Sequence, residues 1–170
     1  MKNFLITLII ILIPVKSFGL IEVDITRGNL NPLPVAVSPL SIDEESRKNF
    51  EKILKKKNIG SEISSIVENN LKVSGLFNPL NKDAFLQEPD IANLKPRFED
   101  WNLIKAQALI TGKVSYVEEK LRVEFRLWDV LAGKEMMALA FTTVPNNWRR
   151  VGHIITDKVY ERLTGEKGYF

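Results

Sequence analysis

The sequence predicts an α/β fold in which a small mixed β-sheet is packed on one face by two main α-helices. Three observations support this prediction. Alternating strand-like stretches follow one another between residues 108 and 144, two longer stretches have the apolar periodicity of amphipathic helices, and a short apolar run between prolines is typical of an inner strand. Helices and strands mixed along one chain bury their apolar faces against each other in layers, which favours an α/β sandwich.

The composition bounds the function. The chain has 170 residues, of which 45% are hydrophobic and 26% charged, as in ordinary globular proteins. It has no cysteine, which excludes disulfides, thiolate zinc sites and a thiol nucleophile. The single histidine would leave a zinc or copper site dependent on carboxylates. We therefore expect no metal and no cofactor.

Residues 1–19 have the layout of a secretory signal peptide. Lys2 precedes an apolar run over residues 4–13, and Ser17 and Gly19 supply the small residues of a cleavage site after Gly19. The run is shorter than the roughly 20 residues that span a bilayer, so a membrane anchor is the weaker alternative and we expect no stable membrane insertion.

Removal of this segment changes the charge of the chain. Cleavage lowers the formal net charge from +3 to +1, because residues 1–19 contain Lys2 and Lys16 and no acidic residue. A nucleic-acid-binding domain needs a dense basic face, so we expect no nucleic-acid partner. An exported chain without cysteine or an Asn-x-Ser/Thr site indicates a bacterial periplasm.

The processed chain would begin with a strand over residues 20–26. Its apolar and polar side chains alternate through Leu20, Ile21, Glu22, Val23, Asp24, Ile25 and Thr26. Such a strand can pair at the edge of its own sheet, or it can be lent to a partner by strand addition, in which main-chain hydrogen bonds provide the affinity. The residues alone leave both alternatives open. A turn-rich linker continues to residue 33.

The next elements are shorter. Val35–Val37 reads as an inner strand covered on both faces, with Pro34 and Pro39 at its ends. The polar stretch 41–58 is expected to be a loop that leads into a short exposed helix, which Gly60 then stops.

A longer helix is expected to follow, with Ser61 as its N-cap and Gly75 as the C′ residue. Its apolar stripe comprises Ile63, Ile66, Val67, Asn70 and Leu71. Residues 76–79 turn the chain, with a short edge strand as one interpretation. Residues 81–96 are expected to be a loop, and residues 98–107 a short helix with Trp101 and Ile104 pointing inward.

The second half gives the clearest pattern. Strands are expected over residues 108–117, 121–128 and 135–144, joined by tight turns into an antiparallel meander. A final helix is capped by Asn146 or Asn147 and ended by Gly165. The face that it buries comprises Trp148, Val151, Gly152, Ile155, Val159 and Leu163.

We find no catalytic constellation. The sequence lacks a glycine-rich phosphate loop and a Gly-x-Ser-x-Gly nucleophile elbow. His153 and Asp157 are neighbours on a helix, but they lie away from its apolar face, which favours an ion pair or a polar tether over a catalytic dyad. The carboxylate pairs Glu44–Glu45 and Glu118–Glu119 lie in exposed segments. Trp101, Trp128 and Trp148 are interpreted as core anchors, with Trp128 the least buried.

Five segments in order resemble the N-terminal domain of the TolB family, which belongs to the Tol–Pal system of the cell envelope. They are Pro34–Pro39, Ile66–Phe77, Ala108–Gly112, Arg126–Asp129, and Arg149–Asp157 continuing into Tyr160–Phe170. The resemblance implies an α/β module without catalytic function, located in the periplasm. It also implies that the opening segment of the processed chain, here Leu20 to Asn31, docks TolA, and that the system maintains outer-membrane integrity and supports envelope constriction in cell division.

The resemblance also sets the expected domain boundaries. They are a signal peptide at 1–19, a docking strand and linker at 20–33, an α/β domain at 34–165, and at 166–170 the start of a linker to an absent C-terminal β-propeller. Since that propeller carries the main surface for Pal in the family, Pal binding is in doubt for this chain. The alternative function is that of a related α/β module, which acts as a cell-wall synthase activator or secretion-pore component; a hydrolase using His153 is a third class.

Overall fold

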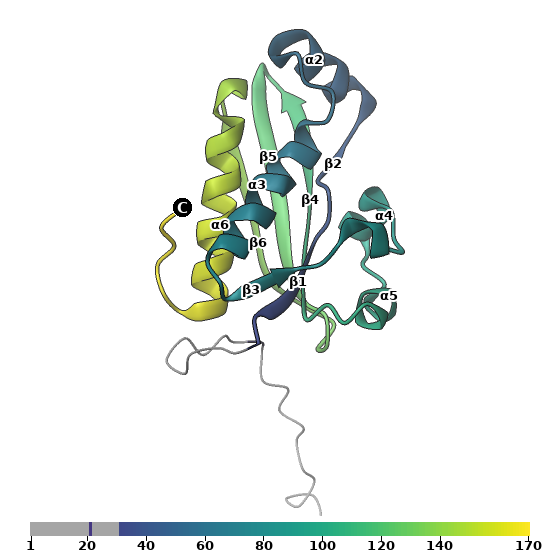
Figure 1. Cartoon of the computed structure of the whole chain (residues 1–170). Coiled ribbons are helices and arrows are strands. Elements are labelled where there is room, and N and C mark those ends of the chain that lie inside the picture. Colours follow the sequence, from purple (N-terminus) through teal and green to yellow (C-terminus); the bar gives the residue numbers. More distant parts are fainter. Residues whose placement is uncertain (1–20, 22–30) are drawn as a thin grey trace, which may run out of the picture.

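The computed structural model describes Ile21 and residues 31–170 (Figure 1). The strands are β1 (Leu33–Val37), β2 (Ser41–Ile42), β3 (Phe77–Pro79), β4 (Ala108–Val117), β5 (Lys120–Asp129) and β6 (Lys134–Thr143). The helices are α2 (Glu44–Leu54), α3 (Ile59–Val73), α4 (Pro89–Leu94), α5 (Phe98–Leu103) and α6 (Trp148–Thr164), with short 3₁₀ turns at Lys82–Ala84 and Pro145–Asn147. The expected strand at 20–26 lies outside the described residues, apart from Ile21.

The six strands form one mixed sheet in the order β3-β1-β4-β5-β6, with the short β2 paired to β4. Strand β1 lies parallel to both β3 and β4, whereas β4, β5 and β6 are joined by antiparallel pairs. The predicted meander and the inner position of β1 are therefore confirmed. Tight turns join the antiparallel strands β4, β5 and β6, whereas helices lie along the chain between the parallel strands β1, β3 and β4.

Helices α3 and α6 lie side by side on one face of the sheet, as Figure 1 shows. This face holds the main core, to which β5 contributes Leu121, Val123, Phe125 and Leu127, each at most 1% exposed. Burying such a side chain stabilises the fold by about 1.5–3 kcal/mol relative to exposing it. The prediction of two helices on one face of a mixed sheet is confirmed.

The opposite face is covered only in part. A smaller core lies there beneath α4 and α5, centred on Trp101 and including Ala36 of β1 and Leu109 of β4. The indole N–H of Trp101 donates to the Oε1 of Gln87 (3.0 Å), and the ring packs edge-to-face on Phe85. Because α4 and α5 cover only one part of this face, β5 exposes Arg122, Glu124 and Arg126 on it, and β6 exposes Ala138 and Ala140.

Three local expectations were wrong. Residues 81–96, expected to be a loop, contain a 3₁₀ turn and helix α4, which is too short to show a helical period. Residues 41–58, expected to begin with a loop, begin with the short strand β2, which precedes α2. Helix α3 begins at Ile59, so Gly60 lies inside it and Ser61 is not its N-cap. A Cβ atom on Gly60 would lie 2.2 Å from the Leu40 carbonyl oxygen, so the glycine permits close packing and does not stop a helix.

Candidate functional site

The predicted docking residues meet the domain at Ile21, the one member of that set that the structure describes. The Ile21 backbone N–H donates to the Oδ2 of Asp129 at 3.2 Å, and the half-buried Ile21 side chain packs against the main core. Leu20 and residues 22–26 lie outside the described residues. Ile21 is thus joined to the domain at the carboxyl end of β5.

Asp129 is suited to hold a backbone amide. It is 1% exposed, and its Oδ1 accepts a second hydrogen bond from the Ala132 N–H at 2.8 Å, inside the β5–β6 turn. A buried carboxylate costs free energy unless its oxygens are hydrogen-bonded, so these two amide donors stabilise Asp129 in place. The sequence did not single out Asp129 as a docking residue. The feature of the sequence that could have indicated this role is a carboxylate at the end of an alternating strand, directly before the apolar Val130.

His153 is a polar tether between helices, one of the two interpretations that the sequence favoured. Its Nδ1 lies 2.9 Å from the Nδ2 of Asn70 on α3, which also donates to the Thr156 hydroxyl at 3.2 Å. Asp157 accepts a hydrogen bond from the Phe170 N–H instead. Since the carboxylate is engaged by the chain end and the imidazole by α3, the pair does not have the geometry of a catalytic dyad.

The chain end lies along α6. The Tyr160 ring packs edge-to-face with the rings of Tyr169 and Phe170, whose centroids lie 5.5 and 5.8 Å away. Burial raises the pKa of the Tyr160 phenol, and the neighbouring Tyr169 adds to the effect. Residues 166–170 therefore pack on the domain in this structure.

The other candidate residues are structural. Glu44 and Glu45 occupy the first turn of α2, where negative charge suits the helix dipole. Glu118 and Glu119 form the tight β4–β5 turn. Trp101 and Trp148 are buried, at 1% and 5% exposure. The half-buried Trp128 donates its indole N–H to the Thr111 hydroxyl, so the expected order of burial is confirmed.

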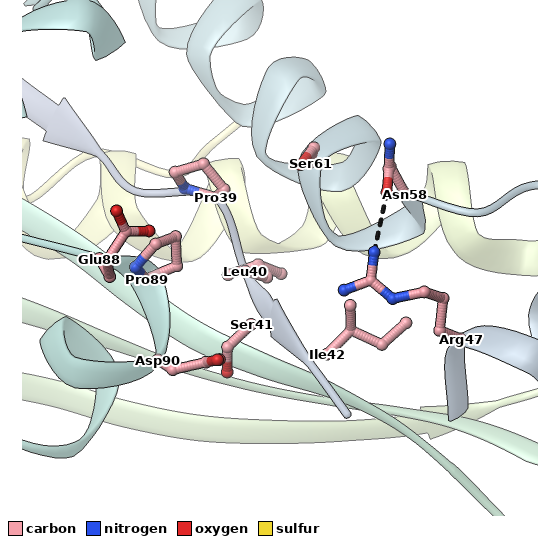
Figure 2. A pocket seen from close by; sticks show the side chains of 10 residues that line it. All are labelled: Pro39, Leu40, Ser41, Ile42, Arg47, Asn58, Ser61, Glu88, Pro89 and Asp90. Carbon is pink, nitrogen blue, oxygen red and sulfur yellow. Dashed lines mark hydrogen bonds between the residues drawn. The ribbon is translucent and has the colours of Figure 1, made fainter. Parts of the chain in front are cut away.

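A polar cleft of about 240 Å³ lies where β2, α2, α3 and α4 meet (Figure 2). Arg47 lies on one side of it and donates to the Asn58 Oδ1 at 3.2 Å, while Glu88 and Asp90 lie on the other side. The lining residues include no imidazole, and Arg47 is their one basic side chain, so the cleft sets a guanidinium opposite two carboxylates. The sequence could not have revealed it, because four separate elements supply its walls.

Within Ile21 and residues 31–170, no cluster of three or more His, Asp or Glu side chains is arranged to hold a metal ion. In the same part of the chain, none of the helices has both the length and the apolar character required to cross a bilayer.

Comparisons of the sequence and of the structure with known proteins point to the same family. The family model of the TolB amino-terminal domain matches residues 21–136. The Tol-Pal system protein TolB of Pelagibacter ubique (strain HTCC1062) is 83% identical over 163 residues, which cover 96% of this chain and 36% of that protein. The crystal structure of TolB from Acinetobacter baumannii superposes with a TM-score of 0.64 at 20% identity, covering 81% of this chain and 30% of the other. The chain thus spans about a third of the length of these relatives.

Proposed function

The chain belongs to the TolB family, and from that premise we propose that it acts as a non-enzymatic adaptor of the Tol–Pal system in the periplasm. The 83% identity over nearly the whole chain is the observation that carries the proposal, because the relative concerned is a Tol-Pal system protein. As part of that system, the adaptor would maintain outer-membrane integrity and support envelope constriction in cell division.

The proposed mechanism is docking of TolA through residues 20–26. In this mechanism Ile21, Val23 and Ile25 bury one face of an added strand against a sheet of the partner, while Glu22 and Asp24 set its register. The alternation of apolar and polar residues along the segment supports this mechanism. Because Ile21 packs against the main core of its own domain and donates to Asp129, docking would release Ile21 from these two contacts.

The domain assignment forms part of the proposal. Residues 1–19 would be removed as a signal peptide, residues 20–33 would form the docking strand and its linker, and residues 34–165 would form the α/β domain. Residues 166–170 would begin a linker towards a propeller. Contact with Pal belongs to the propeller in this proposal, so the domain described here would bind TolA without Pal.

Deletion of residues 20–27 tests the docking mechanism. The variant that lacks these residues should no longer bind the periplasmic end of TolA in a pull-down, while its circular dichroism spectrum shows an intact α/β fold. Retained binding would remove the mechanism, and recovery of a cell-wall synthase or a secretion-pore protein without any Tol component would favour the alternative function.

A pair of matched variants separates the two faces of the segment. Replacing Val23 and Ile25 by Asp should weaken TolA binding at least about tenfold, because buried apolar anchors dominate the affinity of an interface. Replacing Glu22 and Asp24 by Gln and Asn, on the other face, should change it by less. Equal losses in both variants would contradict strand addition.

A further inference from the structure

Strand β6 is an open edge of the sheet. It pairs with β5 on one side, and no strand among the described residues pairs with its other side. In an antiparallel pair, every second residue directs its N–H and C=O groups away from the partner strand. The outer side of β6 therefore presents a row of backbone donors and acceptors to any further strand.

The features that usually protect an edge lie at one end of β6. Lys134 and Glu135 supply charge there, and Met136 is the extra residue of a register shift opposite Leu127 and Trp128. The Arg162 side chain also donates to the Met136 carbonyl oxygen at 3.3 Å. Charges and bulges of this kind keep edges from pairing with other chains.

The remainder of the edge lacks such protection. From Met137 to Val144 the sequence contains no charged residue and no proline. On the helix-covered face, Leu139 is 37% exposed and Phe141 is half-buried against Phe125. A long, uncharged and exposed edge is a template for strand pairing.

The other face of the same edge is lined by small side chains. Ala138 and Ala140 are exposed and form the floor of a shallow groove of about 200 Å³, with Glu124 and Arg126 of β5 beside it. Between residues 137 and 143, no bulky side chain of β6 on this face would obstruct an approaching strand.

We propose that a second copy of this chain pairs with β6 in antiparallel orientation, about a two-fold axis at Ala140. In this register Leu139 lies opposite Phe141 of the second copy on the helix-covered face, and Ala138 lies opposite Thr142 on the other. The seven uncharged residues 137–143 then pair with one another.

Charge supports the same register. Glu135 falls opposite Pro145 and Lys134 opposite Asn146, so no two like charges face each other across the axis. Shifting the pairing by one residue would place every side chain of the second copy on the opposite face of the sheet. Fewer apolar side chains of the two copies would then lie opposite each other. The inference does not depend on the Tol–Pal proposal, because the pairing uses residues 134–146 and none of the proposed docking residues 20–26.

Single cysteines test the register directly, since the chain contains none of its own. In an Ala140→Cys variant, the two cysteines would face each other with Cβ atoms about 5 Å apart, so mild oxidation should give a covalent dimer. Ala138→Cys is the matched control on the same strand and face. In the proposed register its two cysteines lie about 13 Å apart and should not cross-link. Equal cross-linking of both variants, or of neither, would overturn the proposal.

Sedimentation of the chain without substitutions gives an independent test. A single strand pair is a small interface, so we expect the average mass to rise towards that of a dimer between about 1 µM and 1 mM. Thr142→Lys should shift this rise to at least about tenfold higher concentration, whereas Val73→Lys, on the exposed side of α3, should leave it unchanged. A chain that stays monomeric throughout, or a dimer that Thr142→Lys leaves intact, would overturn the proposal.

Discussion

The backbone N–H of Ile21 donates a hydrogen bond to the Oδ2 of Asp129, which lies 108 residues further along the chain. This contact ties the start of the described chain to the end of β5, where the carboxylate is buried. Asp129 also holds the β5–β6 turn through the Ala132 N–H. One side chain therefore joins the proposed docking segment to the sheet.

Asp129→Asn should weaken this attachment selectively. An amide side chain has one acceptor oxygen, so it can keep the bond to Ala132 but cannot also accept from Ile21. A hydrogen bond to a charged group contributes about 1.5–3 kcal/mol, so the Ile21 amide should exchange with deuterium at least about tenfold faster, with an unchanged circular dichroism spectrum.

Two further variants control that experiment. Ile21→Pro removes the donor without changing Asp129, so the Ala132 amide, which donates to the other oxygen of Asp129, should exchange at an unchanged rate. Asp83→Asn alters an exposed carboxylate in a 3₁₀ turn and should have no effect there. Unchanged exchange of the Ile21 amide in Asp129→Asn would show that the carboxylate does not hold the segment.

Gly60→Ala should destabilise the fold although alanine is the better helix former. The added methyl would lie 2.2 Å from the Leu40 carbonyl oxygen, which is a backbone atom and cannot move aside without shifting β2 or α3. We expect a loss of about 1–3 kcal/mol in the free energy of unfolding, measured by urea denaturation. Ser61→Ala should cost less than about 0.5 kcal/mol, because Ser61 is not the N-cap. A large loss in Ser61→Ala would instead support the cap.

Asp43 makes the stability of α2 dependent on pH. The hydrogen bond from the Ser46 backbone N–H lowers the pKa of Asp43 below its ordinary value of 3.8, helped by the Ser46 hydroxyl and Lys113 against an opposing effect of burial. Since the folded pKa is the lower one, this contribution is complete above pH 3.8 and is lost as the pH falls through the folded pKa.

Asp43→Ala should therefore lower the free energy of unfolding by about 1 kcal/mol at pH 7. The difference from the unsubstituted chain should be smaller at an acidic pH below the folded pKa of Asp43, where the carboxylate is protonated, than at pH 7. Asp43→Asn keeps a capping oxygen and is the control, with a smaller loss at pH 7. A loss in Asp43→Ala that is equal at both pH values would contradict a role for the charge.

The β4–β5 turn offers a stabilising change. Glu118 and Glu119 have φ angles of 48° and 61°, in the left-handed region that disfavours most side chains. Asn and Gly are preferred at the two central positions of such a turn. The double replacement Glu118→Asn with Glu119→Gly should raise the free energy of unfolding by about 0.5–1 kcal/mol in thermal or urea denaturation. A fall in stability would indicate that the glutamates have another structural role.

Much of the fold could be predicted because its signals are local. The alternation in β5 and the stripe on α6 repeat over ten or more residues, so they identify both the element and its buried face. Gly75 and Gly165 were correctly predicted as helix ends, since both have the left-handed conformation that follows a helix. Helix α4 was missed because six residues are too few to show a period.

The candidate site was less predictable. The alternation of residues 20–26 and the polar role of His153 can be predicted from nearby positions in the sequence. The residues that they contact cannot be predicted in this way. Asp129, Asn70 and the walls of the cleft come from elements far apart in the sequence. Gly60 was misread for the same reason, because the carbonyl that requires a glycine there belongs to residue 40.

The sequence by itself determined the kinds of element in the main body of the domain, their buried faces and the family, because each depends on residue spacing or on similarity along the chain. Only the tertiary structure decided which carboxylate holds Ile21, which glycine permits close packing and which strand is left with an open edge. These properties depend on distances between segments that are remote in sequence, and residue spacing carries no information about such distances.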